Sequence, residues 1–322
     1  GAMCTAMTYQ TDCFYAGRNL DYEHSFGEQL VITPRHYVFS RGRRQETHYA
    51  MLGMAYVTEN YPLYFDGVNE KGVYLAGLHF VGNAVYAEGA GENVAQYELI
   101  PWILGQCSSA QEAMKRLKKC HITSVPFRND LPASPLHWLL ADRKDCYVIE
   151  PTSQGVQVFS NPVGVLTNNP PFPFQLFALN NYQQLTAKEA DNRFAPTLQL
   201  TRYSRGMGAM GLPGDFSSQS RFVRGAFVRM NSASEQGEEE SVSQMFHMLG
   251  AVEQPRGCCQ LENGSWEITR YIGCCNADRG IYYYTTYENR QLTAVDLHRE
   301  PLDGNQLICY PLESCQQIKW MN

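Results

Sequence analysis

The chain has 322 residues, of which 44% are hydrophobic, and its formal net charge is −6 at pH 7. This length fits one large domain or two ordinary ones, with enough apolar residues for a sizeable core. The acidic balance and the lack of any run rich in Lys and Arg argue against nucleic-acid binding. No apolar run approaches the ~18 residues that a membrane-spanning helix needs, so we expect no membrane span.

Strands dominate the first half of the chain, in the order 4–9, 13–18, 49–57 and 73–80. A helix is expected after Gly91, running to Leu104, and a second helix follows the capping box Ser109–Glu112. Short alternating strands come next, at 136–141, 146–150 and 155–159. The prolines between 162 and 173 exclude a long helix there, which leaves Asn168 on a loop or at a strand end.

The segment Gly206–Gly211 matches the dinucleotide-binding pattern, but Leu212-Pro213 stands where the phosphate-binding helix should begin. We therefore interpret it as a glycine-rich loop. Helices are expected from Ser217 to Met230 and, after the acidic stretch 235–240, over 242–249. Strands at 268–274, 281–287 and 292–297 close the chain. Strands at both ends with helices between them indicate an α+β layered fold, and the absence of linkers and repeats favours a single domain, 4–322.

The chain contains eleven cysteines. An odd number without a recognisable signal peptide favours reduced thiols and a cytoplasmic location over a disulfide framework. The vicinal pairs Cys258-Cys259 and Cys274-Cys275 lack the spacing of zinc knuckles, so we expect no metal and no cofactor. Four others have apolar neighbours and are expected to fill small spaces in the core: Cys13, Cys107, Cys146 and Cys309.

Cys4 stands directly after Met3, and Gly1-Ala2 resembles the remnant of a cleaved expression tag. We therefore expect residues 1–3, the tag remnant plus an initiator methionine, to precede a functional chain that begins at Cys4. A free α-amine has a pKa of roughly 7.7–8.0 and can act as a base near neutrality. The same residue would then carry a nucleophile and its base. Most cysteines near a terminus are inert, so position alone does not decide the matter.

Several blocks of sequence, in register along the chain, resemble the choloylglycine hydrolase family. They are Met3–Thr5, Gly17–Asp21, Asp66–Gly72, Leu166–Asn168, Leu212–Phe216 and Ser220–Phe222. The family comprises bile salt hydrolases and penicillin V acylases, which are amidases with an N-terminal nucleophile. The resemblance implies a four-layer αββα sandwich, in which two antiparallel sheets lie between helical layers, and a homotetramer.

The resemblance also implies a set of catalytic residues: Cys4, Arg18, Asp21, His79, Asn168 and Arg221. The Cys4 thiolate would attack an amide carbonyl, with its α-amine carrying the proton to the leaving amine. Arg18 would lower the thiol pKa, and Asp21 would orient the α-ammonium form. The Asn168 side chain and the backbone N–H of His79 would stabilise the oxyanion. Arg221 would hold the site in order, although an arginine at such a place is otherwise a surface ion pair.

His79 departs from the family pattern, because bile salt hydrolases typically carry asparagine at this position and penicillin V acylases carry tyrosine. If the backbone amide is the donor, the chemistry survives and only the pocket wall differs. A protonated imidazole would instead make the site sensitive to pH. A hydrogen-bonded core histidine is an equally open interpretation.

A steroid acyl group requires a broad apolar cleft with few polar anchors. The candidate lining residues flank the motif blocks, although each alone could be ordinary core: Leu20, Phe26, Phe65, Leu131 and Leu136. Arg205 could pair with a terminal carboxylate of the substrate, or it is simply a solvated loop residue.

We therefore expect hydrolysis of glycine- or taurine-conjugated bile acids. The alternatives are a penicillin V acylase or another acyl-amide hydrolase on the same scaffold and, from a different class, an inactive bile-acid-binding relative. Acyl transfer to other amines stays open, as does the choice between glycine and taurine.

Overall fold

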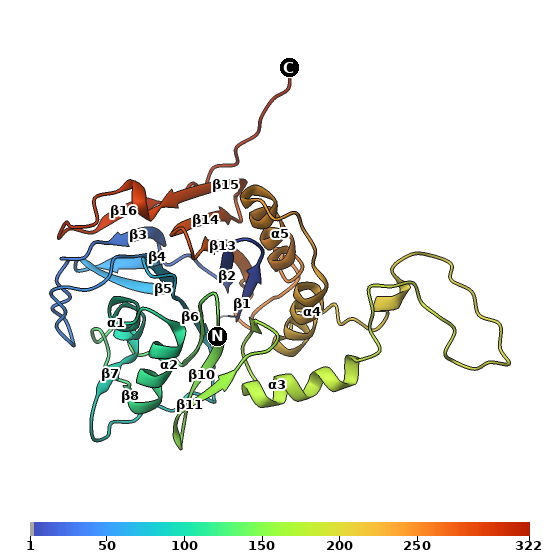
Figure 1. Cartoon of the computed structure of the whole chain (residues 1–322), viewed down its shortest axis with the longest axis horizontal. Helices are drawn as coiled ribbons and strands as arrows, with labels where there is room; N and C mark the ends of the chain where they lie inside the picture. Colours follow the sequence, from blue (N-terminus) through green and yellow to red (C-terminus); the bar gives the residue numbers. More distant parts are fainter. Residues whose placement is uncertain (1–2) are drawn as a thin grey trace.

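The computed structural model describes residues 3–322, so the expected tag remnant, Gly1 and Ala2, lies outside the described residues. Two large antiparallel sheets pack face to face, and helices cover both outer surfaces (Figure 1). Figure 1 also shows the two ends of the chain meeting in the same sheets, with the first strands beside the last ones. The expected four-layer αββα sandwich of the α+β class is confirmed.

Sheet A has six strands in the order β12-β1-β2-β13-β14-β15. They are β1 (Met3–Gln10), β2 (Phe14–Tyr22), β12 (Val165–Leu166), β13 (Ile268–Asn276), β14 (Ile281–Thr286) and β15 (Asn289–Asp296). The first strand pairs with β2 on one side and with β12 on the other. The start of the chain is therefore fixed inside a sheet rather than left as a free end.

Sheet B has eight strands in the order β11-β10-β9-β6-β5-β4-β3-β16. They are β3 (Gln29–Thr33), β4 (Met51–Thr58), β5 (Tyr61–Asn69), β6 (Tyr74–His79), β9 (Leu136–Ala141), β10 (Cys146–Thr152), β11 (Gly155–Ser160) and β16 (Ile308–Pro311). A small parallel pair is formed by β7 (Asn93–Ala95) and β8 (His121–Thr123). Strand β6 lies in the middle of sheet B and faces β1 across the core.

Helices α4 (Ser218–Asn231) and α5 (Glu238–Gly250) cover sheet A, whereas α1 (Leu99–Gln106) and α2 (Ala110–Lys119) cover sheet B. Helix α3 (Phe172–Ala178) follows β12. Short 3-10 turns complete the list: η1 (Gln96–Glu98), η2 (Leu179–Tyr182), η3 (Met207–Ala209) and η4 (Leu297–Arg299). Between η2 and α4 the chain, residues 183–217, extends well away from the layers as a long arm (Figure 1).

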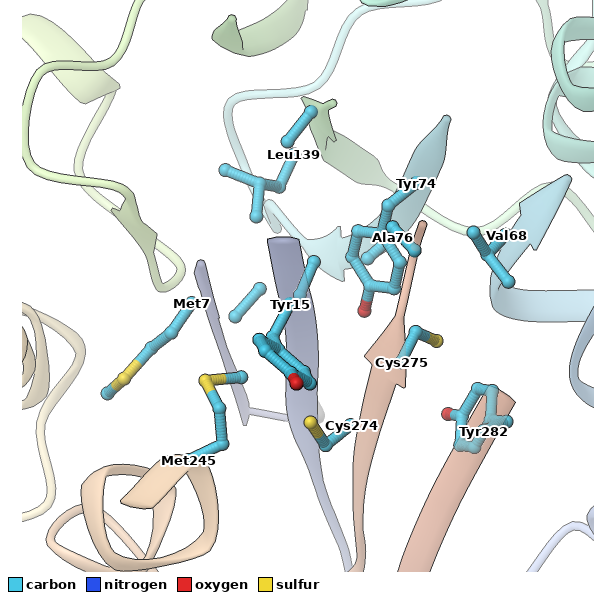
Figure 2. Packing of buried hydrophobic residues seen from close by; sticks show 14 of the residues in the cluster. Met7, Tyr15, Val68, Tyr74, Ala76, Leu139, Met245, Cys274, Cys275 and Tyr282 are labelled. Carbon is cyan, nitrogen blue, oxygen red and sulfur yellow. The ribbon is translucent and has the colours of Figure 1, made fainter. Parts of the chain in front are cut away.

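The core fills the space between the sheets and the space under the helices (Figure 2). Successive residues of a strand point to opposite faces, and the vicinal pair on β13 shows this directly. Cys274 lies on the side of Tyr15 and Met245, whereas Cys275 lies on the side of Tyr74 (Figure 2). Burial raises the pKa of both thiols. The two cysteines are therefore both buried core residues, one on each face of β13.

The structure corrects several expectations about single elements. The helix expected from Gly91 begins only at Leu99, because 93–95 pairs with β8 as a strand. Helix α3 begins at Phe172 within the proline-rich segment, since a proline in the first turn loses no helical hydrogen bond. Strands β3, β5 and β16 were not expected at all. Cys309 is exposed rather than a core filler, and Cys13 and Cys146 are half-buried.

All eleven cysteines have free thiols. Within residues 3–322, no group of three His, Cys, Asp or Glu side chains is placed to hold a metal ion. The helices of this part of the chain are all too short or too polar to cross a bilayer.

Candidate active site

The register of sheet A brings Asn168 beside Cys4. In β1, Ala6 pairs with Leu166 and Met7 with Val165. Continuing this antiparallel register two residues along places Asn168 opposite Cys4. The contact is direct, because the Cys4 backbone nitrogen donates to Asn168 Oδ1 at 2.9 Å. On the other side of β1, Cys4 pairs with Leu20 of β2.

The alternation of β1 and β2 divides the neighbours of Cys4 between the two faces of sheet A. Arg18, opposite Ala6, reaches toward sheet B, where its Nη1 donates to the carbonyls of Phe65 at 2.9 Å and Gly77 at 2.6 Å. Thr5 faces the helical layer and accepts from Arg221 of α4 at 2.8 Å. Cys4 therefore lies between two buried arginines, one on each side of the sheet.

Arg18 occupies the place where the ladder between β5 and β6 ends. The hydrogen-bonded pairs stop at Asp66↔Ala76. The carbonyls of the next residue on each strand, Phe65 and Gly77, accept from Arg18 instead. The guanidinium is fully buried, and its Nε and Nη2 find no acceptor among residues 3–322. Buried donors normally have partners. Arg18 therefore has two nitrogens whose N–H groups are not used by protein acceptors of the described residues.

Burial raises the pKa of the Cys4 thiol. The positive charges of Arg18 and Arg221 act in the opposite direction, and the negative charge of Asp21 adds to the effect of burial. The two arginines are thus the groups that favour the thiolate in this dry environment.

Asp21 is a buried carboxylate with an open position. Its Oδ1 accepts from Thr269 Oγ1 at 2.7 Å, whereas its Oδ2 has no donor within the described chain. Burial raises the pKa of Asp21 to about 7, against the opposing charges of Arg221 and Arg18. A nearby ammonium group would satisfy the open oxygen.

Glu267 is a neighbour that sequence reasoning missed. Its Oε1 accepts from the backbone nitrogen of Met3 at 2.9 Å, and its Oε2 accepts from the Cys259 thiol at 3.4 Å. Only 1% of the side chain is exposed, and burial raises its pKa. It stands directly before β13, two residues from Thr269, where no local pattern marks it. The segment ahead of Cys4 is therefore held by a buried carboxylate.

Arg221 ties the start of β1 to the Asn168 loop. Its Nη1 donates to the carbonyl of Cys4 at 2.7 Å, and its Nη2 donates to Asn168 Oδ1 at 2.8 Å. Helix α4 places the arginine in its first turn, where Ser217 caps the helix by accepting from Ser220. The side chain is fully buried, which excludes the alternative of a surface ion pair.

The amide of Asn168 also contacts β6, where Nδ2 donates to the His79 carbonyl at 2.8 Å and keeps a second N–H. The backbone of Phe80 bonds to Pro135 of the segment before β9. Since antiparallel pairs alternate, the N–H of His79 points away from β9. Burial and the charge of Arg18 lower the pKa of the His79 imidazole to about 4, so the ring is neutral near pH 7.

A largely apolar cavity opens beside this group. It is lined by all five residues expected to contact an acyl group, and it also touches Arg18, Gly77 and His79. Further lining residues that sequence reasoning missed are Tyr56, Leu63, Tyr64, Gln96, Tyr97, Phe127, Pro132 and Ser134. Several of these come from β4, β5 and the loop before β9, where nothing in the local pattern separates cavity wall from core. Arg205 is exposed on the arm and does not line the cavity.

Comparisons with known proteins show the family of the chain. Residues 4–310 match the family model of linear amide C–N hydrolases, choloylglycine hydrolase family. A protein named bile salt hydrolase/transferase from Lactiplantibacillus plantarum is 50% identical, over 99% of this chain and 100% of its own length. Another with the same name, from Clostridium perfringens, is 34% identical over 99% of this chain and 100% of its own length.

Two solved structures resemble this one. A crystal structure of a mutant conjugated bile acid hydrolase from Clostridium perfringens has a TM-score of 0.93 and 33% identity, covering 99% of this chain and 100% of that chain. The penicillin V acylase of Agrobacterium tumefaciens shares the fold, with a TM-score of 0.76 and 19% identity over 97% of this chain and 92% of that chain. The chain belongs to the choloylglycine hydrolase family of linear amide C–N hydrolases.

Proposed function

We propose that this protein is a bile salt hydrolase, which cleaves the amide bond that joins a bile acid to glycine or taurine. The observation that carries the proposal is the place of Arg18, which lies beside Cys4 and also lines the apolar cavity. A steroid acyl group in that cavity would bring its amide carbonyl to the thiol. The bile salt hydrolases named among the relatives support this substrate class.

In the proposed reaction, the Cys4 thiolate attacks the carbonyl carbon and the carbonyl oxygen becomes an oxyanion. The second N–H of Asn168 and the backbone N–H of His79 donate to that oxygen. The α-amine of Cys4 takes the thiol proton and passes it to the leaving amine, so the C–N bond breaks and a thioester forms. A water molecule then attacks the thioester, its proton returns to the sulfur, and the bile acid leaves.

The reaction requires a free α-amine, so we propose that residues 4–322 form the active unit, a single domain that begins at Cys4. With Met3 in place, Cys4 is fully buried, and Met3 Sδ lies 3.3 Å from Arg221 Nη2. Loss of Met3 would turn the Cys4 nitrogen into an α-amine, and Asp21, which pairs with Met3 across β1 and β2, has an oxygen without a donor in the described chain.

One assay separates the candidate activities. Protein that begins at Cys4 is incubated with glycocholate, taurocholate and penicillin V, and release of each amine is measured. Turnover of the bile salts supports the proposal, whereas turnover of penicillin V alone would assign the chain to the acylases, a possibility raised by His79. Binding of bile salts without turnover would indicate an inactive relative. Added amines that appear as new conjugates would show acyl transfer, an activity named for the relative from Lactiplantibacillus plantarum.

We further propose a homotetramer in the cytoplasm. The arm 183–217 extends away from the layers (Figure 1), and its Phe194 and Tyr203 are 82% and 77% exposed. Large apolar side chains in such an arm are typical of a segment that packs on a neighbouring molecule. The eleven free thiols suit a reducing compartment. Light scattering on the protein with and without residues 190–205 tests the assembly.

A further inference from the structure

The short segment that carries Asn168 is held by buried side chains at successive backbone groups. The Thr167 carbonyl faces His137 Nε2 at 2.8 Å, and the Asn168 nitrogen donates to Ser218 Oγ at 2.8 Å. The Asn169 carbonyl accepts from Gln175 Nε2 at 3.1 Å. Among these partners His137 is the titratable one, and the proposed chemistry gives it no role.

His137 is the second residue of β9 and is completely buried, and both of its ring nitrogens have polar partners. A carbonyl oxygen can only accept, so Nε2 must carry a proton and donate to Thr167. On the other side of the ring, Nδ1 lies 2.9 Å from Glu150 Oε2, so a proton is shared between that pair. The ring of Phe80 stacks on the imidazole at 4.3 Å and 7°.

Glu150 holds the other end of the segment 167–172. Both of its carboxylate oxygens lie 3.1 Å from the Phe172 backbone nitrogen, at the start of α3. The His137–Glu150 pair therefore binds the chain at Thr167, the residue before Asn168, and again at Phe172, four residues after Asn168. The pair also contacts Phe80, the residue that follows His79 at the end of β6.

The position of Asn168 determines how its amide lies relative to Cys4 and His79, which the proposed reaction uses. Asn168 contacts the Cys4 nitrogen with Oδ1 and the His79 carbonyl with Nδ2. A displacement of its backbone by about 1 Å would break that alignment, and errors of this size cost on the order of 10²-fold in rate in other enzymes. We propose that His137 is a positioning residue that holds Asn168 in its working position. The proposal rests on the proposed function.

His48 offers a control, because it is a second histidine with a polar partner on each ring nitrogen, and it lines no part of the cavity. It is also buried, at 6% exposure, and its ring nitrogens lie 2.8 Å from the carbonyls of Tyr49 and Tyr37. Its ring packs on Phe39 at 5.0 Å. If such histidines only stabilise the fold, His48 and His137 variants should behave alike.

The test compares three variants in protein that begins at Cys4. His137→Phe keeps the aromatic stack and removes the donor, His137→Gln keeps a donor, and His48→Phe is the control. We expect His137→Phe to lower kcat for taurocholate about 10²-fold with little change in KM, because it acts like the loss of an oxyanion donor. His137→Gln should restore much of kcat. His48→Phe should lower the melting temperature without lowering kcat.

Crystal structures of the same variants give a readout that needs no substrate. We expect the hydrogen bond between Asn168 and the His79 carbonyl to be lost in His137→Phe and kept in His137→Gln and His48→Phe. An unmoved Asn168, or equal effects of the two phenylalanine variants on kcat, overturns the proposal. If His137→Phe does not fold, His137→Met replaces it with the same expectations, because it also removes the donor to the Thr167 carbonyl. Wild-type protein that cleaves no bile salt would refute the proposed function alone, because the structures still decide the role of His137.

Discussion

Replacing Arg18 with methionine removes the charge beside Cys4 and keeps most of the volume. The change leaves the carbonyls of Phe65 and Gly77 without their donor. It also takes the nearest cation from Asp66, a fully buried carboxylate whose pKa burial raises and Arg18 lowers. Arg18→Met should therefore weaken both the fold and the nucleophile.

Leaving a buried carbonyl without its donor costs about 1–3 kcal/mol, and the two carbonyls of Phe65 and Gly77 lose theirs here. The hydroxyls of Tyr74 and Tyr282 still donate to Asp66, at 2.7 Å and 2.8 Å, so we expect a total of about 3 kcal/mol. At about 2 °C per kcal/mol for a chain of this size, the melting temperature should fall by roughly 6 °C. Because Arg18 lowers the pKa of the Cys4 thiol, its loss should move alkylation of Cys4 to higher pH.

The assay combines thermal melting with the rate of Cys4 alkylation by iodoacetamide between pH 6 and pH 10, with the alkylated residue identified by mass spectrometry. Arg229→Met is the control, since Arg229 is a half-buried arginine that donates to the Thr8 carbonyl at 2.8 Å, but its charge does not act on Cys4. We expect lower stability in both variants and a shifted alkylation profile only in Arg18→Met. An unshifted profile in that variant would refute the role assigned to Arg18.

Three further predictions concern the other residues of the site. Asn168→Ala should lower kcat about 10²–10³-fold while Cys4 is still alkylated, because only an oxyanion donor is lost. Steady-state kinetics with taurocholate measures this loss, and an unchanged kcat would contradict the role of Asn168. His79→Asn should keep kcat for bile salts, because the backbone N–H is the donor. It should change the ratio of penicillin V turnover to glycocholate turnover, because the His79 ring lines the cavity. A large loss of both rates would contradict the backbone role of His79. In the chain that still carries residues 1–3, the pKa of Asp21 is about 7 in the folded state and about 3.9 in the unfolded state. Between these two pH values the folded state binds one more proton than the unfolded state. The free energy of unfolding therefore falls by up to about 1.4 kcal/mol per pH unit as the pH rises from 4 to 7. Asp21→Asn should flatten that slope in denaturant titrations, and an identical slope contradicts the assignment.

The motif blocks allowed the sandwich and the catalytic group to be predicted, because each block holds residues that meet only in this fold. Cys4 and Asn168 are 164 positions apart in sequence and form a direct hydrogen bond. No local periodicity expresses such a contact, and only the family resemblance pointed to it. The catalytic roles themselves remain predictions until they are tested.

Other features could not be predicted because their signals are local and ambiguous. Leu136–Ala141 was expected to be a strand, and it is one, but nothing in its pattern separates His137 from an ordinary buried residue. Its partner Glu150 lies on the next strand, β10, and Thr167 follows two further strands, β11 and β12. The contacts of His137 with these residues therefore form only after the strands have come together. Glu267 escaped notice for the same reason. Cys309 was misjudged because apolar neighbours do not show which side of an edge strand faces water.

The most direct test of the central claim compares two preparations of the same protein. One begins at Cys4 and the other retains Gly1, Ala2 and Met3, and intact-mass spectrometry verifies both. We expect glycocholate to be hydrolysed only by the form whose first residue is Cys4, because only that form has the α-amine beside the thiol. Equal turnover by the form that retains Gly1 would contradict it.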